Sequence, residues 1–298
     1  MRQQLFQFGI PAFTRHTAQL RDHRKSCKLA NLIDKMSHTV LFLISLMIGV
    51  VQADTPQGQF VNLNFSVGDS QRTAALWVPS NYDPAKSWPL IVFLHGGGGN
   101  GDNNGDAIGW INQWQKNPLL TPISDLPALV AIPRAPKDHG WVDSPRTAQH
   151  SEWVRNNVDM GREHSISHID AAIDAAQSNF AVDPLRITIM GFSMGGYGTV
   201  RYGALRTDRL AALAPIAGFG TIVLEDAKVL STIPIWAIQG DQDQLVPAEQ
   251  ARRMVQAIKA AGGDVRYTEY EGAGHGETFR RALENSEVFE WLLEQKND

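Results

Sequence analysis

The sequence has almost no cysteine. Cys27 is the only one in 298 residues, and it lies in an N-terminal segment that we expect to be removed. The remaining chain would then hold no thiol. This excludes disulfide bonds, a cysteine nucleophile and Cys-ligated metal sites from the body of the protein.

The N-terminal apolar run is too short to span a bilayer comfortably. It covers 40–51, and the tripeptide Val51-Gln52-Ala53 that begins at its last residue has compact residues where a signal peptidase requires them. Lysines precede it, at Lys25, Lys28 and Lys35. The pattern predicts a leader over residues 1–53 with a secretory signal peptide cleaved after Ala53, and hence a secreted or periplasmic protein. A membrane anchor or a buried helix is the alternative.

Met36 is a candidate start, which would make residues 1–35 a misassigned extension, although Met36-Ser-His-Thr lacks Lys and Arg.

Positive charge is also scarce beyond the leader. Residues 1–53 hold seven Lys and Arg and two Asp, which leaves 20 basic and 29 acidic side chains, a net charge of −9. This balance argues against nucleic acid or anionic lipid as a partner.

Short apolar or alternating segments predict strands, and amphipathic segments between them predict helices. The alternation indicates an α/β fold with a mostly parallel, doubly wound sheet and helices on both faces. No linker divides 54–298, so we expect a single domain there. The predicted strands are 60–67, 71–78, 89–95, 128–132, 186–190, 210–216, 235–238 and 265–270, and the predicted helices are 167–178, 197–205, 247–260 and 279–293.

Gly191-Phe192-Ser193-Met194-Gly195 follows one predicted strand and opens a predicted helix. A strand, a G-x-S-x-G turn and a helix are the context of a nucleophile elbow. Side chains at Gly191 and Gly195 would collide with the neighbouring strand and helix. The alternative is a glycine-rich turn with an incidental serine.

A serine nucleophile needs a histidine base, and the base needs a carboxylate. His275 is the only histidine after Ser193, in the glycine-rich segment 272–276, which we expect to be a flexible loop. Asp241 and Asp243 follow a buried strand. We favour Asp243 as the acid that reaches His275, with Asp241 capping the turn. Glu225 and Asp226 are less favoured.

The oxyanion needs backbone donors, which we expect from Met194 and from Gly97 or Gly98. Residues 96–101 also fit the dinucleotide fingerprint G-x-G-x-x-G, but acidic residues follow where a pyrophosphate would lie. Asp102, Asn104 and Asp106 weakly resemble a calcium loop without its glutamate. We expect neither a cofactor nor a metal.

Tryptophan is concentrated between 110 and 153, at Trp110, Trp114, Trp141 and Trp153; most should be core, but Trp141 is a candidate to line the site. The histidines between 139 and 168 precede Ser193 and do not match the expected order of Ser, acid and His, so we expect them to be solvated or structural. They are His139, His150, His164 and His168.

Four motifs together resemble the α/β-hydrolase superfamily, in particular secreted esterases related to polyhydroxybutyrate depolymerases, feruloyl and acetylxylan esterases, and prolyl-oligopeptidase-type hydrolases. The motifs are residues 95–99, 183–198, 240–247 and 270–276. The resemblance implies a triad of Ser193, Asp243 and His275 and leaves the second oxyanion donor open.

The expected function is a serine hydrolase that cleaves a small-molecule or carbohydrate-linked carboxylic ester through an acyl-enzyme. The alternatives are a peptidase of the prolyl-oligopeptidase type and a non-catalytic binding protein on the same fold. A lactonase or dienelactone hydrolase is less favoured, because that group in its best-known form uses cysteine. We expect no stable membrane span after the signal peptide is cleaved.

Overall fold

The computed structural model describes residues 58–101, 107–113, 123, 126–137, 140–141, 164–219 and 226–297. The predicted leader, Cys27 and the Ala53 cleavage site lie outside these residues. Among the helices in the described ranges, none is long and apolar enough to cross a membrane.

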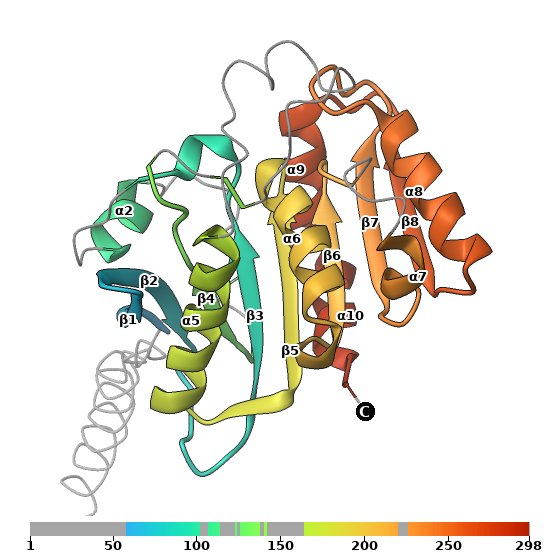
Figure 1. Ribbon diagram of the computed structural model, residues 1–298. Helices are drawn as coiled ribbons and strands as arrows, with labels where there is room; N and C mark the ends of the chain where they lie inside the picture. The colour runs from blue at the N-terminus through green and yellow to red at the C-terminus, as the bar shows by residue number, and fades with distance from the viewer. Residues whose placement is uncertain are drawn as a thin grey trace, which may run out of the picture. The chain divides into compact units, whose positions relative to one another are not determined.

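Eight strands form one sheet in the order β1-β2-β4-β3-β5-β6-β7-β8 (Figure 1). The pairs β1–β2 and β2–β4 are antiparallel, and all other neighbouring pairs are parallel. The strands are β1 (Gln59–Val67), β2 (Ser70–Val78), β3 (Trp88–Leu94), β4 (Leu129–Ile132), β5 (Val182–Phe192), β6 (Ala212–Ile216), β7 (Ile235–Gly240) and β8 (Val265–Tyr270).

Helices cover both faces of this sheet, as the alternating pattern predicts. One face packs against α5 (His164–Asn179), α6 (Met194–Leu205), α7 (Ala227–Leu230) and α8 (Ala248–Ala260). The other face packs against α2 (Ala107–Gln113), α9 (His275–Glu284) and α10 (Ser286–Glu294). Two short 3₁₀ helices, η1 (Gly97–Gly99) and η2 (Thr207–Arg209), complete the described elements.

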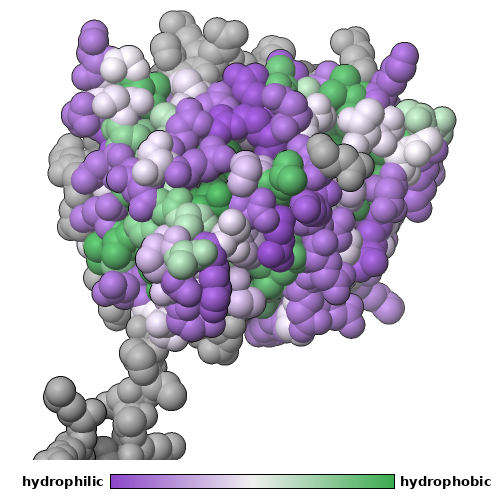
Figure 2. Space-filling model, turned by 90° about the horizontal axis from the view of Figure 1, so that it is seen from below, coloured by the Kyte–Doolittle hydropathy of each residue, from purple (hydrophilic) through white to green (hydrophobic). Residues whose placement is uncertain are grey.

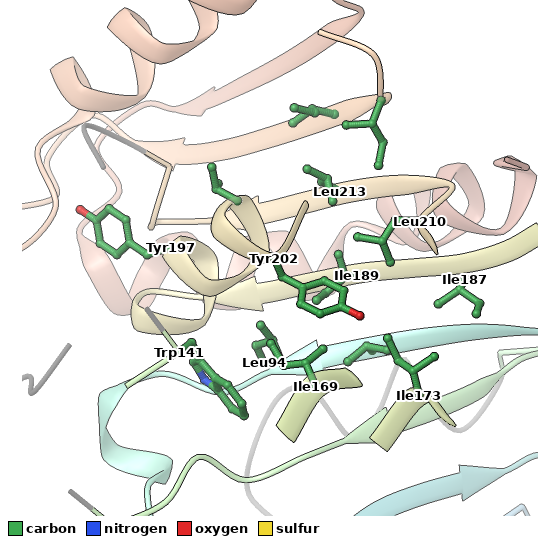
Figure 3. Packing of buried hydrophobic residues seen from close by; sticks show 14 of the residues in the cluster. Leu94, Trp141, Ile169, Ile173, Ile187, Ile189, Tyr197, Tyr202, Leu210 and Leu213 are labelled. Carbon is green, nitrogen blue, oxygen red and sulfur yellow. The ribbon is translucent and has the colours of Figure 1, made fainter. Parts of the chain in front are cut away.

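The central strand β3 shows why the sheet is buried on both faces. All seven of its residues are buried. Leu90, Val92 and Leu94 face the α5–α6 side, and Ile91 and Phe93 face the α9–α10 side. Successive side chains of a strand point to opposite faces, so an uninterrupted apolar run supplies both cores. Figure 3 shows the first core, with Leu94, Ile169 and Leu213 converging from different elements.

The C-terminal end differs from the prediction. The expected single helix over 279–293 is two helices, because Asn285 is extended (φ −86°, ψ 98°) and its side chain accepts a hydrogen bond from the Glu287 amide. Asparagine is a preferred N-cap, so it ends one helix and begins the next. The first of the two also begins earlier than predicted, at His275.

The carboxyl ends of the parallel strands all point to one end of the sheet (Figure 1). Figure 2 shows the opposite end, where hydrophilic residues are interspersed with smaller hydrophobic areas. In an open α/β sheet, ligands bind beyond the carboxyl ends, where neighbouring strands are followed by connections that run in opposite directions. Here β3 connects to β4 on one side and pairs with β5 on the other, so the site is expected beyond β3 and β5.

Candidate active site

Ser193 is the single residue between β5 and α6, and its backbone has a conformation that non-glycine residues rarely adopt. Its φ is 56° and its ψ is −115°. Such a conformation costs roughly 1–3 kcal/mol and persists only where the surroundings impose it. The Ser193 amide donates to the Ile216 carbonyl at 2.8 Å, and the Ser193 carbonyl accepts from the Tyr197 amide at 3.1 Å. The turn is therefore tied to β6 on one side and to its own helix on the other.

The two glycines of the pentapeptide are needed for close packing. A Cβ on Gly191 would collide with the Gly195 carbonyl, and a Cβ on Gly195 would collide with the Leu94 carbonyl at the end of β3. The predicted collisions are thus confirmed. They also show that the elbow lies directly against the end of β3, where the glycine loop begins.

Ser193, His275 and Asp243 form a continuous line of hydrogen bonds. His275 Nε2 lies 2.8 Å from Ser193 Oγ, and His275 Nδ1 lies 2.7 Å from Asp243 Oδ2. An ionised carboxylate only accepts, so Nδ1 carries the proton and the lone pair of Nε2 faces the hydroxyl. This is the arrangement in which an imidazole can take a proton from serine.

His275 is the first residue of α9. The loop expected over 272–276 is confirmed for 272–274, but the histidine itself lies in a helix. Gly274 precedes it in an extended conformation, and its carbonyl accepts hydrogen bonds from the Thr278 amide and the Thr278 hydroxyl, both at 2.9 Å. The histidine is thereby mounted on a helix end. Its side chain keeps 16% of its surface exposed, while that of Asp243 is fully buried.

Asp243 receives four hydrogen bonds in the turn after β7. Oδ1 accepts from the amides of Leu245 at 2.9 Å and Val246 at 2.8 Å. Oδ2 accepts from Gln239 Nε2 at 3.0 Å and from His275. A buried carboxylate stays charged only when it is paired and hydrogen-bonded, and this one is.

Asp241 does not cap this turn, contrary to expectation. The turn amides bond to Asp243, and the buried Oδ1 of Asp241 has no partner among the described residues. Asp226, the other described candidate, pairs instead with Arg201 at 3.2 Å. Only Asp243 of the described candidate acids reaches His275.

The expected oxyanion donors lie on the two segments that meet at the end of β3. Met194 is the first residue of α6, so its amide has no acceptor within the helix. Gly97–Gly99 form η1, in which the Gly99 amide already donates to the Gly96 carbonyl at 3.0 Å. Gly98 has open space beside it. The roles of Met194, Gly97 and Gly98 remain predictions.

His95 holds the start of the glycine loop. It is fully buried, and burial lowers its pKa from 6.5 to about 4, so the ring is neutral. Its Nε2 accepts from the Ala135 amide at 3.0 Å, which leaves the proton on Nδ1, 2.7 Å from the Gly96 carbonyl. A Cβ on Gly99 would collide with this ring. The ring thus requires glycine in the loop that covers it.

Two arginines hold three carbonyls in the second half of the loop, and sequence reasoning missed both. Arg134 donates to the Gly99 carbonyl at 2.8 Å and to the Asn100 carbonyl at 3.1 Å. Arg72 donates to the Gly101 carbonyl at 3.1 Å. The Gly101 amide is held as well, because it donates to the Ala135 carbonyl at 2.9 Å.

Trp141 does not line the site. It is fully buried, its Nε1 donates to the His95 carbonyl at 2.9 Å, and a Cβ on Gly198 of α6 would meet it. Figure 3 shows it beside Leu94 in the core. It therefore holds His95, the residue that precedes the loop glycines.

Phe192 forms an aromatic contact with the candidate base. Its ring lies 4.7 Å from the His275 ring, centroid to centroid, and stacks on Phe279 of α9 at 4.3 Å. It also lies against Gly96, where an added Cβ would be 3.2 Å from the Phe192 ring. The residue before the nucleophile thus contacts both the base and the glycine loop.

The remaining sequence candidates are not part of this arrangement or lie outside the description. His168 is buried in α5. The side chain of His164 and the residues Asp102, Asn104, Asp106, Trp114, His139, His150 and Trp153 lie outside the described part, as does the side chain of Trp110. Within the described part, no cluster of His, Cys, Asp and Glu could hold a metal ion.

The model of the dienelactone hydrolase family matches residues 135–288, more than half of the chain. The chain belongs to the dienelactone hydrolase family. This membership confirms the predicted α/β-hydrolase superfamily and the predicted enzyme class, an ester hydrolase. On the sequence alone, a dienelactone hydrolase is disfavoured because the elbow holds a serine and not a cysteine. That argument is wrong as regards the family, because this chain belongs to it and has Ser193 at the elbow.

This family member is also similar to proteins of known name. Acyl-protein thioesterase 1 of Neurospora crassa is 25% identical over 224 residues, which are 71% of this chain and 88% of that protein. Acyl-protein thioesterase 1 of Gibberella zeae is 21% identical over 198 residues, 62% of this chain and 82% of that one.

Among solved structures, a thermostable esterase has a TM-score of 0.62 and 28% identity. The match covers 80% of this chain and 63% of the esterase, so this hydrolase spans less than two thirds of its length. A ferulic acid esterase has a TM-score of 0.57 and 17% identity, with 80% and 98% covered. Both agree with the α/β-hydrolase fold.

Proposed function

We propose that this protein is a serine hydrolase that cleaves carboxylic esters through an acyl-enzyme on Ser193. The observation that carries the proposal is the hydrogen-bonded line from Ser193 Oγ through the His275 ring to Asp243 Oδ2, at 2.8 and 2.7 Å. The strained backbone of Ser193 supports it, because such strain is retained where it serves function.

In the proposed reaction, Ser193 Oγ attacks the ester carbonyl while His275 Nε2 takes the hydroxyl proton. The tetrahedral oxyanion is held by the Met194 amide and by an amide of Gly97 or Gly98. Collapse breaks the bond to the alcohol, which leaves with the proton from His275. Water then attacks the acyl-serine and loses a proton to His275. Collapse of the second tetrahedral intermediate breaks the bond between the acyl carbon and Ser193 Oγ, which regains the proton from His275, and the acid is released.

Asp243 has the supporting role. Its carboxylate holds the Nδ1 proton of His275 and stabilises the imidazolium that forms during each attack. The four donors around it hold both of its oxygens in place, so Oδ2 stays directed at the His275 ring. The substrate is proposed to be a small-molecule or carbohydrate-linked ester, in keeping with the ferulic acid esterase of similar fold.

Steady-state hydrolysis of short p-nitrophenyl acyl esters tests the proposal. Ser193→Ala should reduce kcat by a factor of about 10⁴ to 10⁶, as in other triads. Retained activity in this variant would rule out Ser193 as the nucleophile. A peptide panel run beside the esters detects a peptidase. Failure of a fluorophosphonate to label Ser193 in the folded wild-type protein would indicate a non-catalytic binding protein.

We further propose that the enzyme is exported and loses residues 1–53. The apolar segment 40–51 and the small residue Ala53 support this, together with the upstream lysines. Secretion also fits a chain whose only cysteine, Cys27, would leave with the leader.

A further inference from the structure

We propose that Gln239 is a positioning residue that holds Asp243 for His275 by donating to the same carboxylate oxygen. The inference rests on the proposed function, because it assigns Gln239 a role in the triad described above. Gln239 lies near the end of β7, four positions before Asp243, and is fully buried. It touches no reacting atom.

The orientation of the Gln239 amide follows from its neighbours. Nε2 lies 3.0 Å from Asp243 Oδ2 and 3.0 Å from the Val246 carbonyl. Both neighbours are acceptors, so the group that faces them must be the NH₂, and each of its two hydrogens has a partner. Gln239 therefore joins the carboxylate to the backbone of the turn that carries it.

The other end of the same amide indicates that this role has a cost. Gln239 Oε1 is buried and accepts no hydrogen bond from the described residues. An unsatisfied buried acceptor is destabilising, and an apolar side chain of the same length would avoid it. Packing alone therefore does not explain a glutamine at position 239. The two hydrogen bonds that its Nε2 donates to Asp243 and to the Val246 carbonyl do explain it.

The contribution to the triad is geometric and electrostatic. Backbone amides fix Oδ1 from one side, and Gln239 fixes Oδ2 from another, so the carboxylate cannot rotate away from His275. A donor on Oδ2 also stabilises the negative charge of the carboxylate. Besides His275, Tyr197 of α6 interacts with this charge: burial and the charge of Asp243 raise its pKa.

Two substitutions separate positioning from packing. Gln239→Met keeps the length and removes both donors, and it should lower kcat about ten- to a hundredfold with little change in KM. Gln239→Glu keeps the shape and can donate one hydrogen bond while protonated. As that proton is lost, two carboxylates face each other, so its kcat relative to wild type should fall as the pH rises.

Tyr202→Phe is the matched control. Tyr202 projects from α6 into the core, and its hydroxyl donates to Asp170 at 2.8 Å (Figure 3). Losing this partly buried hydrogen bond should leave kcat within about twofold of wild type, since it lies outside the proposed machinery. Circular dichroism at each pH restricts the comparison to folded protein, and Gln239→Glu decides the question if Gln239→Met does not fold.

Ser193→Ala is measured in the same assay. If it is inactive while Gln239→Met keeps the wild-type kcat and the Gln239→Glu ratio does not vary with pH, the role of Gln239 is refuted and the proposed function stands. If Ser193→Ala remains active, the proposed function fails, and the role of Gln239 fails with it. A tenfold loss in Gln239→Met with an unchanged Tyr202→Phe supports the inference.

Discussion

At the scale of single residues, the site depends on side chains whose protonation or backbone is fixed by burial. His95 is the clearest case among the described residues. Its neutral ring joins the Gly96 carbonyl to the Ala135 amide, and so holds the glycine loop against the segment that follows β4. A charged ring would lose the bond from Ala135, because both nitrogens would then be donors.

Stability should therefore depend on pH through His95. Burial lowers its pKa from 6.5 to about 4, so below pH 6.5 the unfolded chain binds a proton that the folded protein does not. The stabilisation is present above 6.5 and is lost as the pH falls toward 4. By pH 5 the free energy of unfolding should be lower by about 2 kcal/mol.

Urea unfolding at pH 7 and pH 5 measures this loss. His95→Gln should be less stable than wild type at pH 7 but should lose about 2 kcal/mol less on acidification. Glu277, whose pKa is lowered to about 2 by hydrogen bonds from Arg280 and Arg281, titrates in both proteins and cancels in the comparison. Equal losses in the two proteins would show that His95 is not responsible.

At the scale of elements, the sequence predicts strands better than it predicts helix ends. β5 and the elbow were predictable because a β-branched run, two glycines and a serine are all local signals. The start of α9 at His275 was not, because the glycines at 272, 274 and 276 read as a loop. Asn285 separates α9 from α10 because its side chain caps the start of α10. The asparagine is a capping signal in the sequence, but the apolar periodicity continues across it and predicts one helix.

The leader is the element whose fate is most directly testable. Expressed with its own N-terminus in a secreting host, the protein should be recovered outside the cytoplasm with Asp54 as its first residue. Ala53→Leu should retain the leader, because signal peptidase requires a small residue there. N-terminal sequencing decides; a wild-type product that begins well upstream of Asp54 would refute the proposed cleavage.

At the scale of the whole molecule, the site is a product of sheet order. Ser193 follows β5, Asp243 follows β7 and His275 follows β8, and the parallel arrangement brings all three to one end of the sheet. The order Ser, Asp, His along the chain could be predicted because the sequence predicts this parallel sheet. Arg134 could not, because it reaches the loop at Gly99 only through the pairing of β3 with β4. Gln239 left one signal, a polar residue in an otherwise apolar strand.

The most direct test of the central claim is to find the acyl group on Ser193 during turnover. Wild-type protein mixed with p-nitrophenyl acetate should release a burst of p-nitrophenol, and acid quenching within the burst should trap the acetyl group. Peptide mass spectrometry should place one acetyl group on the peptide that contains Ser193, and none on Ser193→Ala. Turnover that proceeds with no acyl group on Ser193, or that places it on another residue, would contradict the account.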